Sequence, residues 1–145
     1  MGKKTILFIC THNSARSQMA EGFVNSLFGE YYEAYSGGIE PTGINPYVIQ
    51  VMRKIGIDIS DHYAKNVNEF MDRKIDYVVT VCDQAQGSCP FFPGAKTYIH
   101  KGFQDPSPFT GTEEEILEQI RNVRDEIRSW IVKTFGPGDK HDSGE

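Results

Sequence analysis

A cysteine, an arginine and two serines lie close together near the start of the chain. Residues 10–17 read Cys-Thr-His-Asn-Ser-Ala-Arg-Ser. This segment leaves an apolar run and enters a helical pattern, so its backbone N–H groups and the start of the helix can converge on one anion. The Arg16 guanidinium can hold two oxygens of such an anion at once. The same dipoles and charge favour the thiolate form of Cys10, which is a nucleophile.

We therefore predict an oxyanion-binding loop with Cys10 as its nucleophile. The Ser17 hydroxyl can donate a hydrogen bond to the thiolate, and Asn13 tolerates the left-handed backbone that such a loop requires. The predicted oxyanion-binding residues are Thr11, His12, Asn13, Ser14, Ala15, Arg16 and Ser17. Among them, we expect His12 to be a residue of the loop surface and not a base. The alternative is a buried cysteine followed by a helix-capping turn, which does not explain why cysteine, arginine and hydroxyl occur together.

Two further cysteines occur in the second half of the chain. Cys82 ends an apolar run, and Cys89 follows seven residues later. If this run and the one before Cys10 form neighbouring strands, a spacing of about 4.8 Å brings their ends within reach of a disulfide. In one helix, Cys82 and Cys89 would lie about 10.5 Å apart, so pairing them requires that segment to loop or unwind. The alternatives are two unrelated core cysteines, or a zinc site that lacks the usual Cys-x2-Cys knuckle.

A candidate acid follows the last short apolar run. Asp105 precedes Pro106 in a predicted loop. Displacing an oxygen from a tetrahedral anion requires a proton donor for the leaving group. A bound anion and partial burial would favour the protonated form of a carboxyl at this place. An Asp-Pro pair also occurs in ordinary turns, so the pair alone does not assign the role.

Apolar runs and helical patterns alternate along the chain. The runs predict strands at 5–9, 32–35, 77–81 and 97–99, and helical spacing predicts helices at 16–28, 48–55 and 113–135. We expect Gly37 and Gly38 to stop the second strand and Thr112 to cap the last helix. This order predicts an α/β fold, a single-domain doubly wound sheet of about four parallel strands with helices on both faces. Ligands bind such sheets beyond the carboxyl ends of the strands, where two of the cysteines are expected.

The bulk composition sets the wider expectations. With 145 residues, the chain is expected to form one domain over residues 1–135, followed by a flexible tail over residues 136–145. A formal net charge of -5 argues against nucleic acid or an anionic membrane as the partner. Three cysteines are a poor disulfide framework, and no leader or membrane-length apolar run is evident, so we expect a cytoplasmic protein with reduced thiols. No metal site is predicted.

The loop resembles the phosphate loop of the low-molecular-weight tyrosine phosphatases and of the thioredoxin-coupled arsenate reductases, which share one fold. Residues 14–22, Ser-Ala-Arg-Ser-Gln-Met-Ala-Glu-Gly, resemble the reductases especially closely. Residues 79–83, together with Cys89-Pro90 and residues 92–94, resemble the redox segment of the reductases. Asp105-Pro106 and residues 111–115 and 123–127 resemble the ending of that family. The resemblance extends over residues 4–135.

The resemblance implies an arsenate reductase that converts arsenate to arsenite through a Cys10–Cys82–Cys89 thiol–disulfide relay, with a role in arsenical resistance. Cys10 attacks arsenate held by Arg16 and the loop amides, and Asp105 protonates the departing oxygen. Cys82 then attacks the sulfur of Cys10 and expels arsenite, and Cys89 forms a Cys82–Cys89 disulfide that reduced thioredoxin opens. The resemblance also implies that phosphate and sulfate bind as analogues, that no cofactor is bound, and that the protein is a monomer.

Two residues depart from the family pattern, and one of them is Lys101, which stands where many members have an aromatic residue before Gly102-Phe103. The other lies near the loop. Some relatives bind potassium near the loop through residues that correspond to Asn13, Glu21, Ser36 and a later aspartate. The later position corresponds to Lys65 here, and we expect its ammonium to replace the cation.

Two other functions stay open. A low-molecular-weight protein tyrosine phosphatase would hydrolyse phosphomonoesters through a phosphocysteine and would need only Cys10, Arg16 and Asp105. An oxyanion-binding or sensing module with a redox-responsive thiol would need no acid. Cys82 and Cys89 argue against the first alternative, and Asp105 argues against the second.

Overall fold

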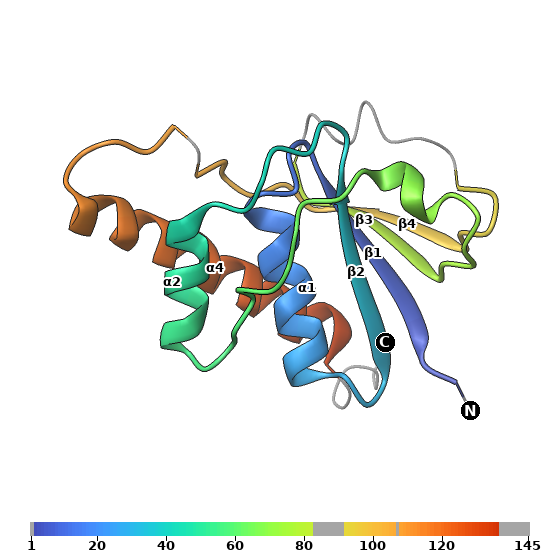
Figure 1. The fold of residues 1–145 in the computed structure, drawn as a ribbon. Coiled ribbons are helices and arrows are strands. Elements are labelled where there is room, and N and C mark those ends of the chain that lie inside the picture. The colour runs from blue at the N-terminus through green and yellow to red at the C-terminus, as the bar shows by residue number, and fades with distance from the viewer. Residues whose placement is uncertain (1, 83–91, 107, 137–145) are drawn as a thin grey trace.

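The computed structural model describes residues 2–82, 92–106 and 108–136, and a four-stranded sheet forms its centre (Figure 1). The strands are β1 (Lys4–Cys10), β2 (Tyr32–Gly38), β3 (Tyr77–Thr80) and β4 (Thr97–His100). They lie in the order β2-β1-β3-β4, and each neighbouring pair is parallel. This confirms the predicted parallel sheet and places β1 and β3 side by side. The predicted tail lies outside the described residues, apart from Gly136.

Helical elements lie on both faces of the sheet, and in the described residues the second face carries a short 3-10 helix. The helices are α1 (Arg16–Leu27), α2 (Pro46–Lys54) and α4 (Glu113–Phe135), together with the 3-10 helix η1 (Val67–Phe70). The alternation of β2 side chains separates the faces: Ser36 bonds to Glu21 of α1, while the ring of Tyr35 packs on Phe70 of η1 at 5.6 Å. Figure 1 shows η1 on the opposite side of the sheet from α1.

The long helix α4 begins and ends where the sequence predicts. Thr112 accepts a hydrogen bond from the Glu115 amide, and the Glu115 carboxylate accepts one from the Thr112 amide, which completes a capping box. At the other end, the Phe135 ring packs edge-on against Phe8, Tyr32 and Tyr77. The end of the helix is thereby fixed against β1, β2 and β3, and Trp130 packs against Phe103, which follows the carboxyl end of β4. Within the described residues, no helix is long and apolar enough to cross a membrane.

The strand ends near Cys10 differ from the prediction in one respect. Gly37 and Gly38 do not stop β2, which continues through both residues and pairs Gly38 with Cys10. The physical reason for a glycine here is the close approach of another segment of the chain, and not a turn. A Cβ atom on Gly38 would lie 2.9 Å from the Asn13 nitrogen and 2.9 Å from the Thr11 carbonyl oxygen. Only glycine lets the end of β2 run this close to the loop that follows β1. The other predicted boundaries agree to within two residues.

This close approach gives a testable prediction. Gly38→Ala should lower the free energy of unfolding by about 1–3 kcal/mol, because backbone atoms of the loop must move aside. It should also speed amide hydrogen exchange at residues 11–16. Gly37→Ala is the matched control, since its Cβ would crowd Val67 of η1 at 3.1 Å and not the loop. Equal exchange at residues 11–16 in the two variants would contradict the prediction.

Candidate active site

The loop between β1 and α1 is held by its carbonyl groups. The amides of Ile39, Glu40, Thr42 and Asn45 donate to the carbonyls of Cys10, Thr11, His12 and Ser14 at 3.2, 2.7, 3.2 and 3.0 Å. Because N–H and C=O of a peptide point in opposite directions, carbonyls that face this segment turn loop amides to the other side. Ala15 occupies the N-cap position of α1 and has no side-chain oxygen to accept from the first helical amides. Amides that face one side in this way can form an electropositive nest of the kind that binds anions.

Asn13 fixes the bend of the loop. Its φ of 52° lies in the left-handed region, as the sequence predicts for this residue. The side chain is buried, and its Nδ2 donates to Ser17 Oγ at 2.8 Å. Its Oδ1 accepts from the Lys65 amide at 2.9 Å. Asn13 thus joins the loop to α1 and to the segment before η1. His12 is half-buried, and its Nδ1 lies 3.0 Å from the Glu40 carbonyl oxygen, so its ring contacts the segment that supports the loop.

Cys10 and Arg16 mark the two ends of the nest. The Cys10 sulfur is buried and lies 2.9 Å from Ser17 Oγ, within hydrogen-bonding distance. Arg16 is 7% exposed, and its Nη1 donates to the Phe103 carbonyl at 3.1 Å. In the described part of the chain, the Arg16 Nε is the one buried side-chain nitrogen or oxygen without a hydrogen-bond partner. A buried N–H without an acceptor is costly, and an oxyanion oxygen would satisfy it.

Asp105 lies at the open side of the same loop. Its Oδ1 is 3.6 Å from the Arg16 Nη2, and its side chain is 47% exposed. The preceding segment is bound to the end of β3, because the Phe103 amide donates to the Val81 carbonyl at 3.1 Å. The structure therefore brings the predicted acid to the predicted anion ligand, at a place that solvent can reach.

Cys82 contacts the loop directly. It follows the end of β3, is 3% exposed, and its sulfur lies 3.3 Å from the Thr11 hydroxyl oxygen. Cys10 is a free thiol. The register of β1 and β3 pairs Ile9 with Thr80, so both cysteines lie at the carboxyl ends of these neighbouring strands. Cys89 lies outside the described residues.

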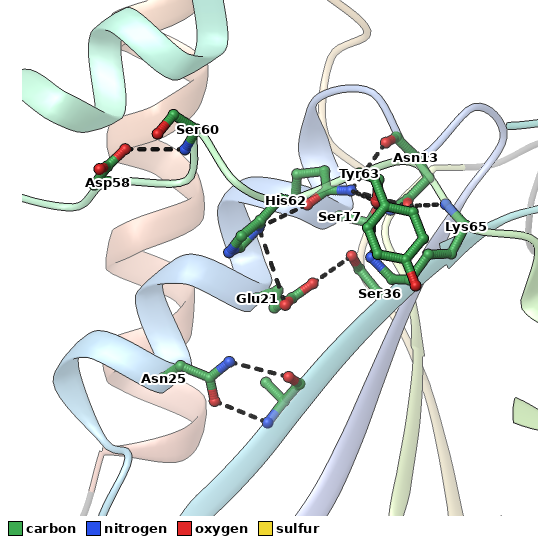
Figure 2. Close-up of polar contacts among 12 residues, drawn as sticks. Asn13, Ser17, Glu21, Asn25, Ser36, Asp58, Ser60, His62, Tyr63 and Lys65 are labelled. Atoms are coloured by element: carbon green, nitrogen blue, oxygen red, sulfur yellow. Dashed lines mark hydrogen bonds and ion pairs between the residues drawn. The ribbon is translucent and has the colours of Figure 1, made fainter. Parts of the chain in front are cut away.

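A polar network beneath the loop was not predicted from the sequence (Figure 2). Gln18 is fully buried in α1, and its amide lies between Asn13 and His62. A glutamine at a buried helix position, close to the loop, is the signal that could have indicated this network. Beside it, Lys65 donates through Nζ to the Tyr63 carbonyl at 2.9 Å and lies 4.8 Å above the Tyr63 ring. Its replacement of a bound cation stays a prediction. Among the described residues, no cluster of His, Cys, Asp and Glu could hold a metal ion.

Comparison with known proteins agrees with this geometry. The family model for low molecular weight phosphotyrosine protein phosphatase matches residues 5–135. The arsenate reductase of Halalkalibacterium halodurans is 46% identical over 135 residues, which cover 93% of this chain and 96% of that protein.

Two solved structures have the same fold. An arsenate reductase in the phosphate binding state superimposes with a TM-score of 0.71 at 29% identity, over 88% of this chain and 93% of the other. The thioredoxin-dependent arsenate reductase of Corynebacterium glutamicum gives a TM-score of 0.61 at 31% identity, over 89% of this chain and 62% of the other. The chain therefore belongs to the low-molecular-weight phosphotyrosine protein phosphatase family and, within it, to the arsenate reductases.

Proposed function

We propose that this enzyme reduces arsenate to arsenite and that Cys10, Cys82 and Cys89 supply the electrons in turn. The observation that carries the proposal is the Arg16 Nε, a buried donor without a partner beside a nest of amides and the Cys10 sulfur. Such a nest fits a tetrahedral oxyanion, and the proposal is supported by the phosphate-bound state of a similar arsenate reductase. Phosphate and sulfate should bind in the same place as arsenate because they share its shape and charge.

The first step forms a bond between sulfur and arsenic. The Cys10 thiolate attacks arsenic(V), and one arsenate oxygen leaves as water after Asp105 has protonated it. The loop amides and Arg16 stabilise the charge on the remaining oxygens. Arg16 is well placed to stabilise this charge, since the Phe103 carbonyl holds its guanidinium in place beside Asp105.

The second step transfers two electrons to arsenic. The Cys82 thiolate attacks the Cys10 sulfur, a Cys10–Cys82 disulfide forms, and the electron pair of the sulfur–arsenic bond stays on arsenic, which leaves as arsenite. The contact between Thr11 and Cys82 supports this step, because it holds the second thiol against the loop. A third exchange, by Cys89 at Cys82, then restores the Cys10 thiolate and leaves a Cys82–Cys89 disulfide.

An external dithiol must reduce that last disulfide. We propose reduced thioredoxin, and the thioredoxin-dependent relative from Corynebacterium glutamicum supports this choice. The relay requires thiols that stay reduced, so we place the enzyme in the cytoplasm, acting as a monomer in arsenical resistance. A phosphatase with the same loop and acid is the second candidate, but the Thr11–Cys82 contact has no role in phosphate ester hydrolysis.

The nucleophile can be tested first. Cys10→Ser should abolish arsenite formation, because a serine hydroxyl is a far weaker nucleophile and cannot enter a disulfide. Binding of sulfate should persist, since the loop amides and Arg16 are unchanged. The measurement is arsenite production with a thioredoxin system, beside sulfate titration and thermal unfolding of the same variant. Sustained turnover by a folded Cys10→Ser variant would refute the assignment.

The acid requires a separate test. Asp105→Asn keeps the shape of the side chain but cannot donate the proton, so turnover should fall by about 10²–10⁴-fold with little change in the Michaelis constant. Asp58→Asn is the matched control, because Asp58 also pairs with an arginine, Arg53 at 3.7 Å, in an exposed contact that does not involve the loop. A change confined to the Michaelis constant would instead make Asp105 a binding residue.

The relay separates the reductase from the phosphatase. Cys82→Ser should stop at the Cys10–arsenic adduct and release no arsenite. Cys89→Ser should release about one equivalent of arsenite per enzyme and then stall as the Cys10–Cys82 disulfide. Single-turnover arsenite measurement with peptide mapping of the disulfides checks both outcomes, and hydrolysis of an aryl phosphate by each variant is the control. Many turnovers of Cys89→Ser with thioredoxin would show that the three-cysteine relay is wrong.

A further inference from the structure

Gln18 is a fully buried polar residue that bonds to Asn13 and not to Cys10, the proposed nucleophile. We propose that Gln18 is a positioning residue, which orients Asn13 and Ser17 so that the Ser17 hydroxyl proton points at the Cys10 sulfur. The inference rests on the proposed role of Cys10 as nucleophile and adds the device that sets its reactivity.

The orientation of the Gln18 amide is fixed by groups that can only accept. Its Nε2 lies 3.2 Å from the Asn13 carbonyl oxygen and 3.1 Å from the Tyr63 carbonyl oxygen. A backbone carbonyl has no proton to donate, so the NH2 end of Gln18 must face both. Its Oε1 then faces His62 Nδ1 at 2.9 Å, and this ring nitrogen carries a proton toward it. Glu21 and Ser36 support this arrangement from the far side: Glu21 lies 4.0 Å from His62 Nδ1 and accepts from Ser36 at 2.6 Å (Figure 2).

The orientation of Asn13 follows from two donors. Its Oδ1 accepts from the Lys65 backbone amide at 2.9 Å and from Gln18 Nε2 at 2.9 Å. A backbone N–H can only donate, so the oxygen of Asn13 must face Lys65 and Gln18. The NH2 group is therefore directed at Ser17 Oγ, at 2.8 Å. Turning the Asn13 amide over would present an oxygen to Ser17 and would break both bonds at the other end.

Ser17 is the last link. It is fully buried and receives a hydrogen bond from Asn13, so its own single proton is available for the Cys10 sulfur at 2.9 Å. A hydroxyl that donates to sulfur stabilises the thiolate over the thiol. If Asn13 presented its oxygen instead, Ser17 would give it the proton, and Cys10 would lose this donor. The direction of every bond from His62 to Cys10 is thus set by the Gln18 amide and the Lys65 N–H.

The experiment measures the reactivity of Cys10 alone. In the Cys82→Ser/Cys89→Ser background, Cys10 is the one remaining cysteine of the chain. There, Gln18→Met keeps the length of the side chain but removes its amide, and the rate of Cys10 alkylation by iodoacetamide at pH 7 should fall by about three- to tenfold, the equivalent of one hydrogen bond. Asn25→Leu is the matched control, because Asn25 lies in the same helix and bonds through both ends of its amide to Ala34 of β2, at 3.0 and 2.9 Å. That variant should lose stability without slowing alkylation.

A double-mutant cycle tests the route through Ser17. In a Ser17→Ala background, Gln18→Met should slow alkylation no further, because the donor that Gln18 positions is already absent. The proposal would be overturned if Gln18→Met lowered the alkylation rate equally with and without Ser17, or did not lower it at all. If thermal unfolding shows that Gln18→Met is not folded, Gln18→Leu gives the same comparison, since it also removes the amide and adds no charge.

The alkylation assay uses no arsenate, so its outcome is independent of the reductase proposal. If the alkylation rates follow the double-mutant cycle as expected but the enzyme makes no arsenite, the proposed function is refuted. The role of Gln18 then still stands. Normal arsenate reduction with alkylation that does not respond to Gln18 would refute the role of Gln18 alone.

Discussion

The active site depends on the hydrogen bonds that the segment after β2 donates to the carbonyl groups of the loop after β1. Amides of the segment from Ile39 to Asn45 bind four loop carbonyls, so the loop amides face away from this segment, toward the proposed anion site. This arrangement requires β2 to run beside β1 as far as Gly38, where a side chain would not fit. The sheet therefore does more than support the loop: its edge register decides which way the peptide groups face, and the electrostatic character of the site follows from that choice.

Much of the fold and the reactive residues could be predicted from the sequence, because these signals are local. The apolar run before Cys10 and the helical spacing after Arg16 define a strand, a loop and a helix over fewer than thirty residues. The predicted bounds of the last helix agree with the structure, since Thr112 and Glu115, three residues apart, cap its first turn. The prediction that Gly38 stops the strand was wrong. In the sequence, a glycine that ends a strand cannot be told from a glycine that lets another segment approach closely.

The remainder of the site depends on contacts between distant segments, which spacing along the chain cannot reveal. Gln18 meets His62 across 44 residues, and Arg16 reaches the Phe103 carbonyl across 87. The orphaned Nε of Arg16 is likewise visible only when the surrounding groups are in place. Resemblance to a family supplied the proposed roles of Cys82 and Cys89, whereas the hydrogen-bond directions beneath the loop came from the structure.

The parallel pairing of β1 with β3 bears on how this chemistry can evolve. Because both strands end at one edge of the sheet, a thiol that arises after β3 lies beside an anion loop that is already complete. Acquiring the second thiol then requires a substitution at one strand end, while the loop, its arginine and its acid can stay unchanged. A chain of this fold can therefore gain a thiol beside the loop without any change in the loop itself.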